Sequence, residues 1–479
     1  MDQAKLRELS DLATMQLQNK PGTVSGRRGG WMMISTILIE AWDLYAISFV
    51  LIFVTHEFAN TPSWEVGLTT AAVQGGALVG SLLGGYIADQ LGRKRVFLAT
   101  MILFIILAIC QSFVTSMWAL AGIRFLLGLP LGSDIANGYA YIMESMPKGK
   151  REQMGIRWQF MFGLGEVISI VVITILYMTG MDIHILWRLA LGLGALPALI
   201  LLIGRLNLPE TPLSLVQRGK FKQAKAVSEQ LFDDPLDMLP DEDTEIEHVK
   251  VSDFLKVIWA DPIKKRATIY GWVSNAMQGA EFSAWAFYTP VILAAAGIGV
   301  SGSLENPGAL IGTNWITAGL YVVATISGFV APYVLPKIGH KGIGMWGFGM
   351  AFVGLVVGGI ALNAQIGPLV IIAGIVLMWG HYWDASNGQT LTALVAPPRF
   401  KGMAAGFGYV FVKAASFFGA FIFPIIRDAL GQGNTALFVS LFSLTGFLCA
   451  AFVLPEMYGY VEQETAELQV KADQMMKKS

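Results

Sequence analysis

Two carboxylates stand inside long apolar runs, in a motif that occurs twice. The copies are Asp134-Ile-Ala-Asn137-Gly and Asp384-Ala-Ser-Asn387-Gly. On a helix, residues three positions apart share a face, so each Asp lies beside its Asn. Apolar surroundings destabilise a charged carboxylate, which can then exchange protons near neutral pH. We therefore expect Asp134 and Asp384 to exchange protons, together with Glu166 and Glu281 in comparable runs.

Neutral polar and aromatic side chains in the same runs could bind a small polar solute. Amides offer hydrogen bonds, and aromatic rings offer stacking surfaces. A structural hydrogen bond between helices is the alternative for each of them. The candidates are Asn137, Gln159, Gln278, Trp285, Tyr288 and Asn387.

The composition is that of an integral membrane protein. The 479 residues are 54% hydrophobic and only 14% charged, whereas soluble proteins carry roughly 25% charged residues. Apolar runs of about 20 residues, enough to cross a bilayer as a helix, recur along the chain. We expect an all-α fold with twelve spans near 31–55, 66–88, 96–114, 117–143, 153–178, 186–205, 268–297, 311–335, 342–362, 367–394, 402–426 and 435–454.

Basic residues gather on one side of the expected spans. Cytosolic loops carry an excess of Lys and Arg, which predicts a multi-pass plasma-membrane protein with both termini in the cytosol. A net charge of −1 gives no indication of a nucleic-acid partner, and protein partners stay open. The basic residues before span one or in even-numbered connections are Arg27, Arg28, Arg93, Lys94, Arg95, Lys148, Lys150, Arg151, Lys337, Lys341, Arg399 and Lys401.

The chain divides into two halves of six spans. An offset of 250 residues superposes Asp384 on Asp134 and also aligns Pro397 with Pro147, at the start of a basic loop in each half. This shared register indicates a duplication, with a binding site between the halves. We expect a cytosolic N-terminal segment, a six-helix bundle, a cytosolic linker, a second six-helix bundle and a cytosolic tail at 1–30, 31–205, 206–265, 266–455 and 456–479.

A loop after span two carries a recognisable signature. The sequence Gly85-x-x-x-Asp89-x-x-Gly92-Arg93-Lys94-Arg95 resembles the loop motif of the major facilitator superfamily. The resemblance implies two pseudo-symmetric bundles that work by alternating access, with this loop as a conformational gate. The alternative is that the basic residues act only as topology anchors. In the second half, Pro336 stands where the Asp would be.

Span four begins with Arg124-x-x-x-Gly, which is similar to another element of that superfamily. A charge inside the membrane needs a partner, and span one supplies Asp43. At about 1.5 Å per residue, both residues reach the outer part of the membrane. We expect Asp43 and Arg124 to form a proton-sensitive pair, with a permanent structural ion pair as the alternative.

Within the superfamily, two branches compete. Span one, span four and Lys413, seven residues after Gly406, resemble phosphate:proton symporters. A lysine in the cavity would favour an anion, unless it extends to the membrane surface. Span seven departs from that branch, and its Gln278 and Tyr288 resemble sugar porters. The sequence "PETP" at 209–212 also resembles a sugar-porter motif.

These features predict a transporter and not an enzyme. The motif GxxxxGK[ST] is absent, so we expect no nucleotide cofactor. His381 and Asp384 have a spacing that could ligate a metal, but no further ligand is near in sequence, and we expect none to bind. We predict proton-coupled symport of phosphate or an organic acid across the bilayer. The alternatives are a proton-coupled sugar porter, a uniporter and a nutrient sensor that does not transport.

Overall fold

The chain is all-helical wherever its structure is described. The computed structural model describes residues 6, 9–10, 12–13, 16–17, 24–59, 61–146, 150–244, 251–286, 289, 292–293, 296–298, 307–397 and 400–460, and no strand occurs among them. Ten helices in these ranges are long and apolar enough to cross a membrane. Leu310–Asn363 counts as two spans, because Gly339 interrupts it with non-helical angles. With α14 (Pro262–Ala286) as span seven, the expected twelve are accommodated.

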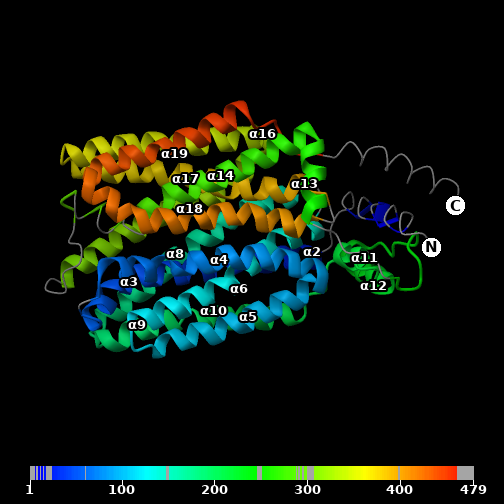
Figure 1. Ribbon diagram of the computed structural model, residues 1–479, viewed down its shortest axis with the longest axis horizontal. Helices are drawn as coiled ribbons and strands as arrows, with labels where there is room; N and C mark the ends of the chain where they lie inside the picture. The colour runs from blue at the N-terminus through cyan, green and yellow to red at the C-terminus, as the bar shows by residue number, and fades with distance from the viewer. Residues whose placement is uncertain are drawn as a thin grey trace.

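The first six spans form one bundle, drawn in blue to green in the lower half of Figure 1. Short breaks divide spans one, five and six into consecutive helices. In chain order, the helices are α2 (Val24–Ile34), α3 (Thr36–Glu57), α4 (Ser63–Leu91), α5 (Arg93–Cys110), the 3-10 helix η1 (Gln111–Phe113), α6 (Met117–Ser145), α7 (Lys150–Ile156), α8 (Trp158–Met178), α9 (Ile183–Gly192) and α10 (Ala195–Leu206).

The other spans form a second bundle above the first in Figure 1. The predicted fold class, an all-α membrane protein of two six-helix bundles, is confirmed. Besides α14, this half contains α16 (Pro307–Asn363), α17 (Gly367–Val395), α18 (Lys401–Leu430) and α19 (Gln432–Phe452).

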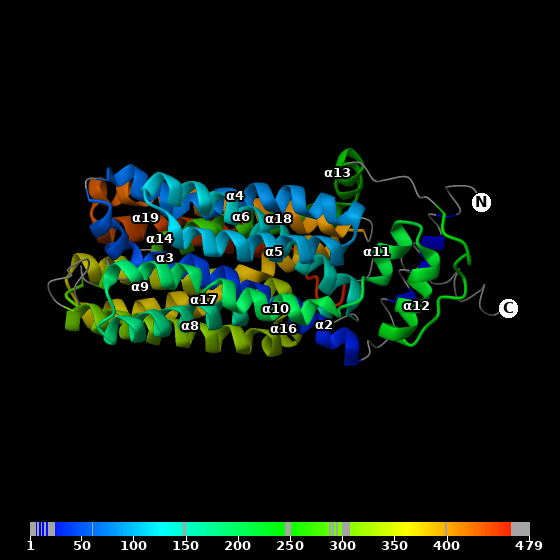
Figure 2. The same cartoon turned by 90° about the horizontal axis from the view of Figure 1, so that it is seen from below.

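Three shorter helices follow the first bundle along the chain. They are α11 (Pro212–Gln217), α12 (Phe221–Phe232) and α13 (Val251–Ala260), and they lie at one end of the two bundles (Figures 1 and 2). Helices α11 and α12 share a small apolar core with Leu6 and Leu17. The predicted linker is therefore partly folded, and its assignment to the cytosol stays a prediction.

The turn between α4 and α5 has a specific local structure. Gly92 has φ 101°, a conformation that side chains with a Cβ rarely adopt. The carboxylate of Glu210 accepts hydrogen bonds from the backbone N–H groups of Arg93 (3.0 Å) and Lys94 (3.2 Å). These N–H groups open α5 and have no partner within the helix, so Glu210 caps it.

The second half repeats this turn inside α16. Gly339 has φ 71°, and the carboxylate of Glu456 accepts hydrogen bonds from the N–H groups of His340 (2.9 Å) and Lys341 (3.3 Å). The same contact between a glycine turn and a distant carboxylate thus occurs once in each half. This repeat agrees with the duplication predicted from the two Asp-x-x-Asn-Gly motifs.

Candidate transport site

A cavity lies between the two halves. Its walls come from α3, α4, α6 and α8 on one side and from α14, α17 and α18 on the other. The described lining residues are Ile37, Glu40, Leu44, Tyr45, Gln74, Tyr139, Trp158, Gln159, Phe162, Gln278, Phe282, Ser283, His381, Ala385, Gln389, Tyr409, Val412, Lys413 and Ser416.

Neutral polar groups and aromatic rings dominate this lining. Both halves contribute amides, including Gln159 from α8 and Gln278 from α14. Trp158 stacks on Tyr139, with ring centroids 4.3 Å apart. Amides bind hydroxyl groups as donors and acceptors, and aromatic faces pack on apolar surfaces. The cavity therefore suits an uncharged solute that has several hydrogen-bonding groups.

The charged residues among the described lining form an ion pair that joins the two halves. Glu40 on α3 pairs with Lys413 on α18, and neither side chain is more than 4% exposed. The hydroxyl of Tyr409 donates to both Glu40 oxygens, at 2.9 and 2.7 Å. The charge of Lys413 is thus neutralised within the protein, which removes the reason for expecting an anionic substrate. Sequence reasoning missed Glu40, although it lies three residues before Asp43 in the same apolar run.

Asp43 and Arg124 meet as the sequence predicts. A guanidinium nitrogen of Arg124 lies 3.3 Å from a carboxylate oxygen of Asp43, and both residues are buried. Arg124 also donates to the carbonyl of Thr69, and the amide of Gln111 donates to Asp43. The pair joins α3 to α6 within the first half. Its other polar contacts are neutral, so Asp43 carries the counter-charge of Arg124.

Asp134 has a cationic partner that sequence reasoning missed. Arg205, in the last turn of α10, donates to both Asp134 oxygens at 2.9 Å. Thr100 donates to Asp134 as well, and Arg205 donates to Thr36. One guanidinium nitrogen of Arg205 thus holds both oxygens of the carboxylate, away from the cavity. The sequence signal that could have revealed this partner is the position of Arg205 at the end of the apolar run of span six.

The two asparagines of the repeated motif bind other parts of the fold. Asn137 accepts a hydrogen bond from Arg93 at 3.3 Å. Asn387 lies 2.7 Å from the His340 ring and donates to Tyr270 at 3.1 Å. Neither asparagine lines the cavity. Both amides thus form hydrogen bonds between helices, which was the alternative to binding the solute.

Of the other residues predicted to contact the solute, some line the cavity and some do not. Gln159, Gln278 and Lys413 line the cavity as expected. Trp285 is buried but does not line the cavity. Its ring packs so closely on Gly374 that a Cβ added there would lie 3.3 Å from it. Tyr288 lies outside the described residues.

Glu166 connects the two halves. It is fully buried on α8 and accepts a hydrogen bond from the hydroxyl of Tyr382 on α17. A domain movement would break or form this hydrogen bond and so change the environment of the carboxylate. Glu166 therefore stays a candidate for proton exchange.

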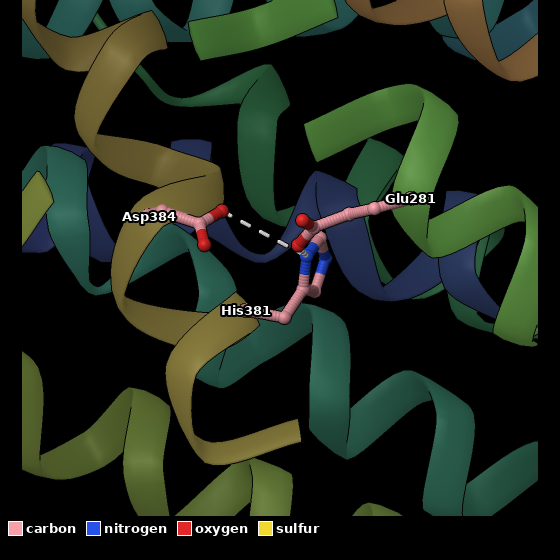
Figure 3. Close-up of side chains that lie close together, drawn as sticks. All are labelled: Glu281, His381 and Asp384. Atoms are coloured by element: carbon pink, nitrogen blue, oxygen red, sulfur yellow. Dashed lines mark hydrogen bonds and ion pairs between the residues drawn. The ribbon is translucent and has the colours of Figure 1, made fainter. Parts of the chain in front are cut away.

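Glu281 and Asp384 lie together beside His381 (Figure 3). The ring nitrogen Nδ1 of His381 lies 3.0 Å from a Glu281 oxygen and 3.8 Å from an Asp384 oxygen. Ser443 donates to the other Glu281 oxygen. The sequence separates Glu281 from this pair by 100 residues, which explains why the third member of the cluster was not foreseen.

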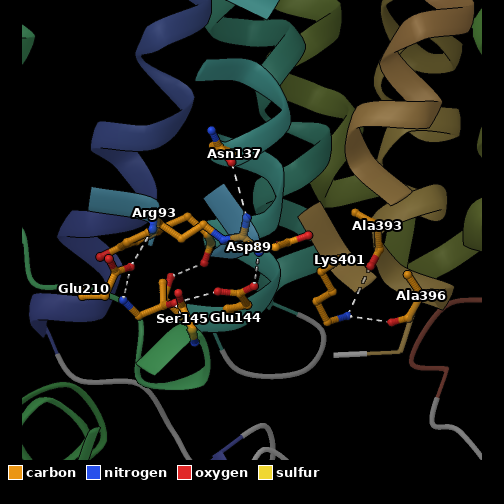
Figure 4. A network of polar contacts seen from close by, with 12 residues as sticks. Asp89, Arg93, Asn137, Glu144, Ser145, Glu210, Ala393, Ala396 and Lys401 are labelled. Atoms are coloured by element: carbon orange, nitrogen blue, oxygen red, sulfur yellow. Dashed lines mark hydrogen bonds and ion pairs between the residues drawn. The ribbon is translucent and has the colours of Figure 1, made fainter. Parts of the chain in front are cut away.

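The predicted gating loop forms a buried polar network at one end of the bundles (Figure 4). Arg93 contacts Asp89 at 2.5 Å and Glu144 at 2.8 Å. Glu144 also accepts a hydrogen bond from Thr211 at 2.6 Å. Arg93 therefore binds helices α4 and α6 together. Lys94 is half-buried and Arg95 is exposed at the same end.

Gly85 lets the two halves approach near this network. A Cβ at Gly85 would lie 2.4 Å from the carbonyl oxygen of Gly402 on α18, and one at Gly402 would lie 2.4 Å from Asp89. Lys401 donates to the carbonyl oxygens of Ala393 (3.2 Å) and Ala396 (3.3 Å), at the end of α17. In this conformation α4 and α18, one from each half, pack closely at this end.

Two six-helix halves around a shared polar cavity define the architecture of a secondary transporter of the major facilitator type. The family model described as "Sugar (and other) transporter" matches residues 31–468. The chain belongs to this family. The sugar-porter resemblance is thereby confirmed, whereas the resemblance to phosphate:proton symporters, and with it the predicted anion, finds no support.

Relatives in this family are named as transporters. The chain is 28% identical over 437 residues to the "Glucose transporter GlcP" of Staphylococcus epidermidis, covering 88% of this chain and 92% of the relative. It is 26% identical over 440 residues to a "D-xylose transporter" of Levilactobacillus brevis, covering 87% and 88%. Among solved structures, the proton:xylose symporter XylE superposes with a TM-score of 0.73 at 18% identity, covering 92% of this chain and 98% of XylE.

Proposed function

We propose that the protein carries a neutral sugar or polyol across the plasma membrane together with protons, by alternating access. The observation that supports this most is the lining of the cavity. Both halves contribute neutral amides and aromatic rings, and the buried lysine is already paired with Glu40. Such a site binds hydroxyl groups and has no free positive charge for an anion. Relatives named for glucose, D-xylose and myo-inositol support the same class of solute.

Asp43 is the proton carrier in this proposal. Its carboxylate is the counter-charge of Arg124, and both groups are buried. Protonation of Asp43 removes that charge and leaves Arg124 free to bind other acceptors. The change alters which conformation of the first half is preferred, and this links proton binding to domain movement.

Three further carboxylates are candidates for a supporting role in proton transfer. Glu166 bonds across the interface to Tyr382, and Glu281 and Asp384 flank His381 next to the cavity. We assign Asp134 a structural part, because Arg205 holds both of its oxygens.

The network around Asp89 and Arg93 acts as the gate. It closes one end of the protein through the contact of Gly85 with Gly402, and it opens when the halves rock apart there. With both termini in the cytosol, as the positive-inside rule predicts, this gate faces the cytosol.

Uptake by purified protein in proteoliposomes tests the proposal. We expect accumulation of labelled D-xylose, D-glucose or myo-inositol under an inward proton gradient, and no competition from phosphate. Uptake that ignores the gradient would indicate a uniporter and refute the coupling. No uptake of any sugar or polyol would refute the transport proposal and favour a sensor.

Asp43→Asn tests the proton carrier. Asparagine mimics protonated aspartate in shape, so we expect loss of gradient-driven accumulation with sugar counterflow retained. The matched control is Asp428→Asn, which changes a surface carboxylate that is 70% exposed and should leave accumulation intact. Normal accumulation by Asp43→Asn would contradict the assignment.

A further inference from the structure

Glu281, His381 and Asp384 form a compact buried cluster outside the gating network. One ligand atom from each residue lies within 4.8 Å of the other two. The residues come from α14 and α17, and all three are at most 1% exposed. His381 stacks face to face on Phe282, with centroids 4.1 Å apart and an interplanar angle of 2°. The imidazole is thereby held in the orientation that directs Nδ1 to the two acids (Figure 3).

Asp384 is the unsatisfied member of this cluster. Neither of its oxygens accepts a hydrogen bond, although both are buried. In its counterpart in the first half, Asp134, one nitrogen of Arg205 donates to both oxygens and Thr100 donates to one of them. A buried carboxylate without a hydrogen-bond donor is costly, because burial removes its hydration. This carboxyl group therefore faces a histidine and a second acid, and no arginine contacts it among the described residues.

We infer that this cluster binds a divalent metal ion of the zinc type. One imidazole and two carboxylates are zinc ligands, and three protein ligands leave a fourth position for water. Bonds of about 2.1 Å in tetrahedral geometry place ligand atoms about 3.4 Å apart. The observed separations from Nδ1, 3.0 Å to Glu281 and 3.8 Å to Asp384, lie on either side of that value.

The surroundings supply an outer contact to one ligand and a path for the ion. Ser443 donates to the second oxygen of Glu281 and orients that carboxylate, as outer groups do around bound metals. His381 lines the central cavity, which offers a path for the ion. On binding, zinc replaces the proton that Nδ1 shares with Glu281, and this proton passes to water. The bound ion would link α14 to α17 and keep Glu281 and Asp384 deprotonated, which takes both out of proton exchange while the metal is bound.

Metal binding to the purified full-length protein in detergent tests this inference and needs no transport assay. After treatment with a chelator, we expect wild-type protein to bind one equivalent of Zn²⁺ in competition with a chromophoric chelator. Co²⁺ should give the intense visible absorption of a tetrahedral site. Asp384→Asn and His381→Ala should each weaken Zn²⁺ binding by more than about 100-fold, and Ser443→Ala by about 10-fold.

Controls separate this site from surface histidines. His56→Ala and His184→Ala remove exposed imidazoles and should leave the single equivalent unchanged. Asp384→Asn keeps the shape of the side chain, so it decides the matter if His381→Ala does not elute as a single species in gel filtration. Absence of stoichiometric binding to wild type, a Co²⁺ spectrum of octahedral type, or unchanged affinity in Asp384→Asn would each overturn the inference.

Discussion

Replacing Glu40 with Gln leaves the ammonium group of Lys413 buried without its counter-charge. The two side chains are only 1% and 4% exposed, so water cannot take over the role of the carboxylate. The hydroxyl of Tyr409 also loses its charged acceptor. We therefore expect Glu40→Gln and Lys413→Met to destabilise the protein separately. The double variant removes both charges and should recover most of the loss.

The size of the effect follows from the burial of the pair. Breaking a buried ion pair by removing one partner costs about 3–5 kcal/mol, whereas replacing both with neutral groups is often close to neutral. At roughly 1 °C per kcal/mol for a chain of this length, each single variant should lower the Tm by about 3–5 °C. The double variant should lie within about 2 °C of wild type.

Thermal stability in detergent, followed by gel filtration after heating, measures these shifts. Lys256→Met is the matched control, because Lys256 is 79% exposed in its pair with Asp253. Such surface pairs contribute about 0–1 kcal/mol, so the control should leave the Tm nearly unchanged. Single variants as stable as wild type, or a double variant that loses the sum of both effects, would refute the reasoning.

Three other substitutions probe packing and charge. Gly85→Val should abolish uptake in proteoliposomes, because a Cβ there would lie 2.4 Å from the carbonyl of Gly402 and keep the halves from closing. Gly92→Ala should lower thermal stability by about 1–3 kcal/mol, since its φ of 101° strains any residue with a Cβ; unchanged stability would show that the turn adapts. Arg205→Met should cost about 3–5 kcal/mol and be rescued by adding Asp134→Asn, and failure of that rescue would contradict the assigned ion pair.

The sequence alone determined the membrane class, the two halves and one buried pair. These features leave strong local signals, because a span needs about 20 apolar residues and a charge inside it needs a partner. Asp43 and Arg124 could be paired from their depth in spans one and four. The loop signature after span two was recognisable because its glycines, acid and basic residues follow each other along the chain.

Tertiary structure alone decided which buried charges are already balanced. Arg205 neutralises Asp134, and Glu40 neutralises Lys413, so two residues predicted to act on protons or an anion have partners within the protein. Glu281 joins His381 and Asp384 from a helix 100 residues away. Such pairings depend on how each helix is rotated about its axis and which neighbour it packs against. Many helix contacts together set both properties, and no local run of residues encodes them.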